Sequence, residues 1–239
     1  MTLHMVEIRP HAVALFRFLE TQGLNGREDE DLGYGVHAWL AAAFGELVPK
    51  PWRLFWDRSR PPRILAYSQA GAEKLYQHLG DFADPGASRV CPKAEDLVSR
   101  PMPTFTMGRR LGLELQCMPV IRKSRTGIEQ DIFLQSQNPS SDRRRRDEVY
   151  CEWVQNQLTA TGAVDVVGMN LHAFRLVHQL RRTRDAKGNR QSSRLIRPQV
   201  QVRGELVVRD ATAFTKLLAR GIGRHTAFGY GMLLLRPPS

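Results

Sequence analysis

The stretch Arg194–Leu235 reads RLIRPQVQVRGELVVRDATAFTKLLARGIGRHTAFGYGMLLL and sets the architecture of the second half of the chain. Four apolar residues alternate along its first part: Val200, Val202, Leu206 and Val208. This alternation predicts a strand over Arg194–Val208. Asp210 is placed to cap a helix that runs through Ala219, because its carboxylate can accept backbone N–H groups of the first turn. A closing strand is expected over Tyr230–Leu235.

The residues before this stretch predict the rest of one folding unit. Arg109–Lys123 alternates well enough for one long strand. Asp142–Leu158 has helical periodicity, and Ser140, Ser141 and Asp142 can cap it. Strand-like runs flank Arg181–Arg190, where Lys187-Gly188-Asn189 favours a turn and therefore a basic hairpin or loop. The order strand, helix, strand, strand, helix, strand is that of a ferredoxin-like domain.

The first half of the chain predicts most of a second unit of the same kind. The expected elements, in order, are a strand near residues 3–8, a helix over Asp31–Leu47 capped by Asp31, strands at Arg53–Trp56 and Arg63–Tyr67, and a helix over Gln69–Leu79. Residues 80–108 are rich in Pro, Gly and polar residues and give only weak strand signals. We therefore expect an α+β chain of two tandem ferredoxin-like (RRM-like) domains, residues 1–100 and 101–239, with a C-terminal glycine-rich loop.

The charge of the chain is concentrated in its second half. Residues 1–100 hold 12 Lys and Arg against 13 Asp and Glu, whereas residues 101–239 hold 23 against 11. Such asymmetry favours a polyanionic partner, with nucleic acid ahead of a membrane surface. A protein that is merely basic is the alternative that composition alone leaves open.

The cysteines and the N-terminal region give no sign of a metal site or of export. Cys91, Cys117 and Cys151 are widely spaced, and no Cys/His cluster has zinc spacing. We therefore expect no metal and no cofactor. An odd cysteine count without a signal peptide fits the reducing cytoplasm. The longest apolar run near the N-terminus, Trp39–Phe44, is far too short to span a bilayer.

The segment Gly221–Gly231 is the first candidate for binding. Four glycines in eleven residues let the backbone pass close to another chain, and exposed N–H groups there favour phosphate oxygens. Gly221 and Gly223 open the segment, and Arg224 and His225 add charge. The segment lacks the Gly-Lys-Ser/Thr ending of a P-loop. A helix stop followed by a tight turn is the simpler alternative.

The same segment resembles a known signature. Gly-Ile-Gly, then Phe-Gly-x-Gly and a Leu-rich strand, is similar to the C-terminus of CRISPR repeat-processing endoribonucleases, in the form of the type I-E Cascade member, the CasE family. Asp31-Leu-Gly-Tyr-Gly-Val-His37 resembles the first helix of that family. The resemblance implies two tandem ferredoxin-like domains. It also implies a metal-independent enzyme that cuts CRISPR precursor RNA at the base of the repeat stem-loop and stays on the crRNA with other Cascade subunits.

Tyr34 and His37 are the candidate catalytic residues. They lie three apart on the expected helix, so they share a face, and the helical wheel directs both away from the apolar stripe. Without the resemblance, a solvated His is the ordinary interpretation. Cleavage without a metal needs a proton removed from the 2′-hydroxyl and another delivered to the 5′-oxygen, and a His can do either at neutral pH. The family forms its active site from a Tyr and a His at this spacing, which implies the same for Tyr34 and His37. Which of them is acid and which is base stays open.

Basic residues of the second half are the candidates for binding RNA. Four arginines fall in the first turn of the expected helix, where the macrodipole disfavours cations, and this arrangement suggests an anionic ligand. The candidates are Arg143, Arg144, Arg145 and Arg146 in that run, Arg181, Arg182, Arg184, Lys187 and Arg190 in the basic hairpin, and Arg122 and Lys123 after a strand. Each run can equally be a solvated charged face.

Two other functions remain possible from the sequence. A non-catalytic subunit that binds an RNA hairpin has the same fold and charge, but it has no need of the Tyr34 and His37 pair. A scaffold within a crRNA-guided complex is compatible with the enzyme. A DNA-binding regulator is less favoured, because the sequence shows no helix-turn-helix or zinc module.

Overall fold

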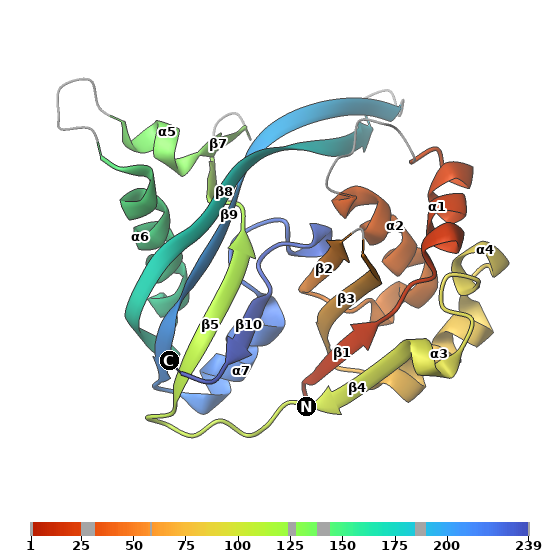
Figure 1. Cartoon of the computed structure of the whole chain (residues 1–239), viewed down its shortest axis with the longest axis horizontal. Coiled ribbons are helices and arrows are strands. Elements are labelled where there is room, and N and C mark those ends of the chain that lie inside the picture. Colours follow the sequence, from red (N-terminus) through yellow and green to blue (C-terminus); the bar gives the residue numbers. More distant parts are fainter. Residues whose placement is uncertain are drawn as a thin grey trace. The chain divides into compact units, whose positions relative to one another are not determined.

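The chain folds into two compact units (Figure 1). The computed structural model describes residues 2–24, 32–57, 59–123, 128–137, 144–184 and 190–238, with the backbone alone for 180–184 and 190–194. The first unit comprises Met1–Met102, Val177–Ile196 and Ala227–Gly229. The second comprises Pro103–Leu176, Arg197–Thr226 and Tyr230–Ser239.

The first unit is built on a four-stranded antiparallel sheet. Its elements are β1 (His4–Ile8), α1 (Ala12–Thr21), α2 (Gly33–Phe44), η1 (Gly45–Leu47), β2 (Trp52–Asp57), β3 (Arg60–Ser68), α3 (Ala72–Phe82), α4 (Pro85–Ser88), η2 (Ala94–Asp96) and β4 (Leu97–Pro101). The strand order is β2-β3-β1-β4. Strand β1 pairs antiparallel with both β3 and β4, so the first strand of the chain is central. This is the ferredoxin-like arrangement that the sequence predicts.

Helix α2 carries the apolar stripe into the core of this unit. Val36, Trp39, Leu40, Ala43 and Phe44 are fully buried, as 3.6-residue periodicity requires for a helix that packs on one side. The indole N–H of Trp39 donates to the carbonyl of Ala87 at 3.1 Å, so this buried polar group is satisfied.

The predicted bounds of α2 are wrong at both ends. The helix begins at Gly33 rather than Asp31, its N-cap is Leu32 in the left-handed region (φ +53°), and no side chain caps it. Asp31 itself lies outside the described residues. The helix ends at Phe44 because Gly45 (φ +50°) turns the chain, well before Pro49 and Pro51.

Among the elements of this unit that the sequence patterns did not reveal are α1 and β4. Helix α1 buries Leu15, Phe18 and Leu19. Strand β4 lies in the region that gave only weak strand signals, and it pairs along the whole of β1, from His4 opposite Pro101 to Ile8 opposite Leu97. Helix α3 also lies three residues later than predicted at both ends.

The second unit contains the other four-stranded sheet, in the order β10-β5-β9-β8. The chain runs through β5 (Arg110–Cys117), β6 (Val120–Arg122), β7 (Glu129–Asp131), α5 (Ile132–Ser136), α6 (Arg146–Thr159), β8 (Val164–Arg184), β9 (Arg190–Val208), α7 (Ala211–Arg220), η3 (Thr226–Phe228) and β10 (Leu233–Arg236). The alternating residues Val200, Val202, Leu206 and Val208 of β9 are all buried. Asp210 caps α7 as predicted, since its carboxylate accepts the N–H of Ala213 at 2.8 Å.

The predicted strand over residues 109–123 is two strands. Strand β5 ends at Cys117, and β6 pairs with β7 in a separate two-stranded sheet. Pro119 lies at the break, where it has no N–H to offer a ladder; its carbonyl accepts the N–H of Ile132 at 3.1 Å. Helix α6 begins at Arg146 rather than Asp142, and Ser140, Ser141 and Asp142 lie outside the described residues.

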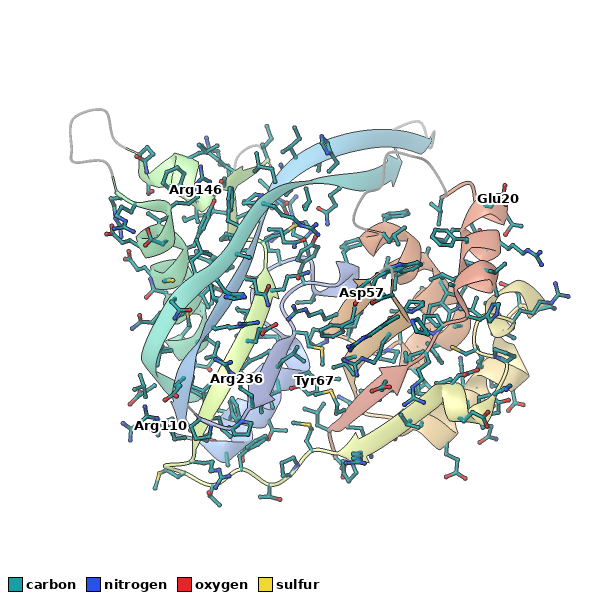
Figure 2. All side chains as sticks on the ribbon, in the orientation of Figure 1. Glu20, Asp57, Tyr67, Arg110, Arg146 and Arg236 are labelled. Carbon is teal, nitrogen blue, oxygen red and sulfur yellow. The ribbon has the colours of Figure 1, made fainter. Side chains whose placement is uncertain are left out.

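The fold class is therefore α+β, with tandem ferredoxin-like sheets. In the first unit, Ile64 and Ala66 of β3 are buried in one core with Val36 and Trp39 of α2. Figure 2 draws the side chains of both units on the ribbon. Within the part of the chain that the structure describes, no helix is both long and apolar enough to cross a membrane.

The close approach of β8 and β9 at two glycines is testable. An ideal Cβ on Gly204 would lie 2.2 Å from the carbonyl oxygen of Gly168, so Gly204→Ala must push two backbones apart. We expect it to lower the free energy of unfolding by about 1–3 kcal/mol. Gly168→Ala is the matched control, because nothing lies within 4 Å of its added Cβ, and we expect a change within about 0.5 kcal/mol. Urea unfolding of both variants measures this, and equal losses would contradict the packing described.

Candidate functional site

Tyr34 and His37 lie side by side on α2 against a third ring. Both are half-buried. The Tyr34 ring stacks on Phe228 with centroids 6.0 Å apart, and the imidazole of His37 meets the same ring edge-on at 4.9 Å. The helical spacing thus places the two residues on one face, as predicted. That face is covered by Phe228 in part and does not simply point into solvent.

Trp52 positions Phe228. This tryptophan is buried at the start of β2, and its indole N–H donates to the carbonyl of Ala227 at 3.0 Å. Gly229 follows with φ +88°, and an ideal Cβ there would lie 2.7 Å from the Trp52 ring. A side chain at this position therefore meets both backbone strain and a steric clash. Residues 227–229 are held against Trp52, and Phe228 is directed toward Tyr34 and His37.

The surroundings of His37 favour its neutral form. Burial lowers the pKa of His37 below its ordinary value of 6.5, and the positive charge of Lys50 lowers this pKa further. The backbone N–H of Lys50 donates to the carbonyl of Tyr67 at 2.9 Å, which fixes the chain at this point, while its side chain is exposed. A neutral imidazole at pH 7 can accept a proton, and the nearby ammonium group adds positive charge to the same region.

The glycines Gly221 and Gly231 close the C-terminal loop. Gly221 ends α7, and its N–H donates to the carbonyl of Leu217 at 2.9 Å. The N–H of Ile222 donates to the carbonyl of Gly231 at 2.8 Å. The buried Gly221 therefore uses its N–H within the protein, contrary to the prediction that it is exposed for phosphate. Gly223 is exposed, and an ideal Cβ on it would lie 2.7 Å from the Trp153 ring.

Arg224 and His225 of this loop are held by a carboxylate from β7. The Arg224 Nε donates to Glu129 Oε1 at 2.8 Å, and His225 Nε2 lies 2.9 Å from Glu129 Oε2. Arg197 of β9 forms an ion pair with the same carboxylate at 3.5 Å. Burial lowers the pKa of His225, and Arg224 and Arg197 act in the same direction, while Glu129 partly offsets this. Burial alone would raise the pKa of Glu129, but His225 and Arg224 outweigh it and the pKa lies below its ordinary value.

The arginine run does not form the first turn of a helix. Arg145 is the N-cap of α6 and only Arg146 lies inside it, while Arg143 is outside the described residues. The argument from the macrodipole is therefore wrong. The negative charge comes from the protein itself: Arg144 pairs with Glu152, and Arg145 pairs with Asp147 at 2.9 Å.

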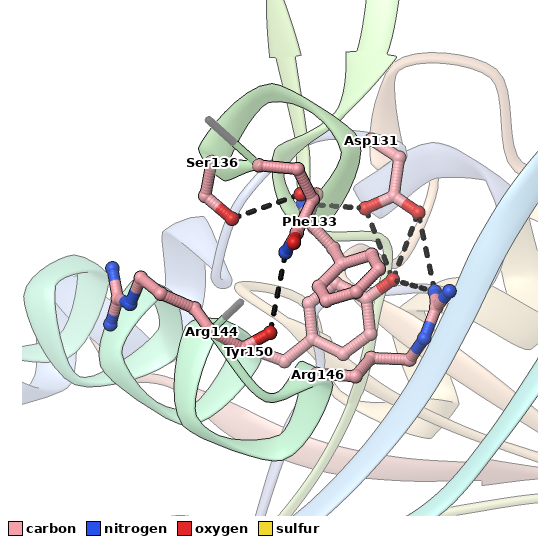
Figure 3. A network of polar contacts seen from close by, with 7 residues as sticks. Asp131, Phe133, Ser136, Arg144, Arg146 and Tyr150 are labelled. Carbon is pink, nitrogen blue, oxygen red and sulfur yellow. Dashed lines mark hydrogen bonds and ion pairs between the residues drawn. The ribbon is translucent and has the colours of Figure 1, made fainter. Parts of the chain in front are cut away.

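Arg146 belongs to a network that packs α5 and β7 against α6 (Figure 3). Its guanidinium lies between the rings of Phe133, at 4.0 Å, and Phe174, at 4.4 Å. Arg146 donates to the Tyr150 hydroxyl at 2.9 Å, and that hydroxyl donates to Asp131 at 2.9 Å. Burial raises the pKa of Tyr150, and Asp131 acts in the same direction. These contacts account for Arg146 without an RNA ligand.

The remaining predicted RNA-binding residues are only partly placed. Arg181, Arg182, Arg184 and Arg190 lie at the facing ends of β8 and β9, where the structure describes the backbone alone. Lys187 lies outside the described residues. Arg122 and Lys123 are exposed at the end of β6.

Sequence reasoning missed Phe228 and Lys50 beside the first pair, and Glu129 and Arg197 in the second cluster. Phe228 lies in the glycine-rich segment together with Tyr230, and Lys50 lies between two prolines; each position was only a weak local sign of a functional site. Glu129 gave no signal, because its partners are almost a hundred positions away along the chain. In the described ranges, no group of three or more His, Cys, Asp or Glu residues is arranged to hold a metal ion.

A family model matches almost the whole chain. The model described as CRISPR associated protein covers residues 3–237. No curated protein matches the chain by sequence.

Solved structures with the same fold include three with related descriptions. The CRISPR endoribonuclease Cse3 bound to 19 nt RNA is 19% identical with a TM-score of 0.63, over 99% of this chain and 100% of that one. Thermus thermophilus Cse3, bound to an RNA representing a pre-cleavage complex, is 19% identical with a TM-score of 0.60 and the same coverage. A chain of a CRISPR RNA-guided surveillance complex is 16% identical with a TM-score of 0.51, over 98% and 100%. These similarities show the fold.

The pKa of His37 tests the geometry of the first site. Phe228→Ala removes part of the apolar cover, and Lys50→Gln removes the positive charge. We expect each change to raise the pKa of His37 toward 6.5. Titration of the imidazole protons by NMR measures the shift, with Lys93→Gln as a control that removes a charge paired with Glu95 elsewhere in the same unit. An unchanged pKa in both variants would mean that the contacts described do not exist in solution.

Proposed function

The chain belongs to the family of CRISPR-associated proteins, and from this premise we propose that it is a metal-independent endoribonuclease of the CasE type. It cuts CRISPR precursor RNA at the base of the repeat stem-loop and remains bound to the mature crRNA as a Cascade subunit. The observation that carries the proposal is the pair Tyr34 and His37 on one face of α2, both against Phe228, with the pKa of His37 lowered.

The chemistry of this pair suits transesterification. His37, neutral at pH 7, removes the proton from the 2′-hydroxyl, whose oxygen forms a bond to the adjacent phosphorus. The bond from phosphorus to the 5′-oxygen breaks, and Tyr34 or a water that it orders supplies the proton to that oxygen. The products are a 2′,3′-cyclic phosphate and a 5′-hydroxyl. Lys50 adds positive charge close to the negative charge that develops on the phosphate oxygens.

The substrate class follows from charge and from the fold relatives. The excess of basic residues lies in residues 101–239, and Arg224 is exposed on the C-terminal loop. Relatives of the same fold include endoribonucleases bound to RNA and a chain of an RNA-guided surveillance complex. The three cysteines of the present chain are free, which fits action in the reducing cytoplasm.

Cleavage of a labelled repeat hairpin in excess EDTA tests the proposal. We expect the wild-type protein to cut, and His37→Ala to reduce the rate by about 10²–10⁴-fold, because a positioned proton acceptor is lost. His78→Ala, a half-buried histidine of α3, is the matched control and retains full activity. A 2′-deoxy nucleotide on the 5′ side of the scissile bond abolishes cutting while binding persists.

Three results would contradict this mechanism in different ways. Tight binding without any cutting by the wild type identifies a non-catalytic RNA-binding subunit. Cutting only after a divalent metal is added leaves the substrate class in place and removes the proposed chemistry. Full activity of His37→Ala removes His37 from the reaction.

The pH dependence of single-turnover cleavage tests the role of His37 as the base. The base must be unprotonated, so the rate rises with pH through the lowered pKa of His37, with a midpoint below 6.5, and is level at neutral pH. Lys50→Gln moves that midpoint upward, because a charge that disfavours the imidazolium is removed. A rate that instead falls as pH rises through the same range would make His37 the acid.

A further inference from the structure

Strand β7 presents two carboxylates that are almost fully covered. The exposed fractions of the Glu129 and Asp131 side chains are 8% and 9%. Asp131 has a structural role, because it holds Tyr150 and Arg146 and so fastens α6. The partners of Glu129 differ, since two of them belong to the C-terminal loop Gly221–Gly231, which the sequence marks as a candidate for binding phosphate.

One carboxylate is shared by three basic side chains from two separate segments. Oxygen Oε1 of Glu129 accepts from Arg224, while Oε2 lies near both His225 and Arg197. His225 also has φ +65°, a backbone conformation that residues other than glycine rarely adopt. The contact with Glu129 stabilises His225 in that conformation.

The most exposed charged group of this cluster is the guanidinium of Arg224. The Arg224 side chain is 45% exposed, whereas Glu129 lies beneath it. Arg197 and Arg224 carry two positive charges against the one negative charge of Glu129, so the cluster keeps a net positive charge even when His225 is neutral. An approaching phosphate therefore meets the guanidinium of Arg224 before it meets the carboxylate.

We propose that Glu129 is a positioning residue for RNA binding: it holds Arg224 and His225 so that the exposed guanidinium meets a backbone phosphate, and it does not touch the RNA itself. This inference rests on the proposed function, because it presumes an RNA ligand for the loop. It assigns to the β6–β7 hairpin the task of orienting the loop that follows α7.

The sign of one mutational effect separates this role from simple electrostatics. Glu129→Gln removes a negative charge next to a site for a polyanion, and Coulomb attraction alone predicts tighter RNA binding. Loss of positioning predicts weaker binding despite the added net charge. The matched control is Glu114→Gln on β5, which makes the same charge change and also breaks an ion pair, with Arg203 at 2.9 Å.

The experiment measures the affinity of each protein for a repeat hairpin over a series of salt concentrations. For Glu129→Gln we expect affinity to fall by about tenfold and the salt slope to fall by about one, as for the loss of one phosphate contact. For Glu114→Gln we expect equal or slightly tighter binding. Tighter binding of Glu129→Gln, or a loss equal to that of Glu114→Gln, would overturn the proposal.

Two further measurements guard against a folding defect. Glu129→Gln added to Arg224→Ala/His225→Ala should weaken binding no further, because the carboxylate then has nothing left to position; an additional loss equal to that in the wild-type background would overturn the proposal. Without RNA, NMR titration should show the pKa of His225 lowered further in Glu129→Gln, since Glu129 partly raises it. An unchanged His225 pKa would show that the contact is absent.

The outcomes distinguish this inference from the function on which it rests. A wild-type protein that binds no repeat hairpin overturns both. A wild type that binds, with Glu129→Gln unaffected, overturns the positioning role alone. Binding without cleavage, with Glu129→Gln weakened, leaves the positioning role in place and removes the proposed catalysis.

Discussion

Two backbone hydrogen bonds at the base of the C-terminal loop fix the segment that supplies Arg224 and His225 to Glu129. The N–H of Ile222 donates to Gly231, and the N–H of Gly231 donates to Gln116 of β5 at 2.7 Å, so the ends of the loop are fixed to the sheet. An ideal Cβ on Gly231 would lie 2.3 Å from the Ile222 carbonyl oxygen, which leaves room only for glycine. Between these anchors lie the residues that reach Glu129 and the one that covers Tyr34 and His37. The glycines of the signature thus shape the loop first, and any contact with phosphate depends on that shape.

Local patterns predicted the elements whose stabilisation is local or strongly periodic. The apolar stripe of α2 and the Asp210 cap of α7 are of this kind, since side chains within a few turns determine them. Strand β4 could not be recognised in the same way. Only Leu97 of its five residues is buried, and its pairing partner β1 lies at the start of the chain. The break at Pro119 was visible in the sequence, but the apolar alternation on both sides of it concealed the change of sheet.

The same difference between local and long-range contacts decides which residues of the candidate sites could be predicted. Helical spacing was enough to place Tyr34 and His37 together, because three residues on a helix nearly complete a turn. Nothing local connects either residue to Phe228, and nothing local connects Glu129 to His225. The arginine run was misinterpreted for a related reason, because the prediction depended on which residue begins α6. The start of a helix depends on its capping contacts. Here the Glu148 carboxylate accepts the Arg145 N–H at 3.3 Å.

The net charge of +11 overstates the field that an RNA would meet. Arginines in the described part of the run and in the C-terminal loop have carboxylate partners: Arg144 with Glu152, Arg145 with Asp147, Arg146 with Asp131, and Arg224 with Glu129. These ion pairs differ in whether their arginine can also bind an RNA phosphate directly. Arg146 lies between two aromatic rings and cannot turn outward without breaking that stack, so its charge contributes at a distance only. Arg224 is exposed above a buried carboxylate and can bond a phosphate while it keeps its partner. The affinity for RNA should therefore depend on whether each arginine is exposed and held in place by a buried partner. The number of basic residues alone does not give this information.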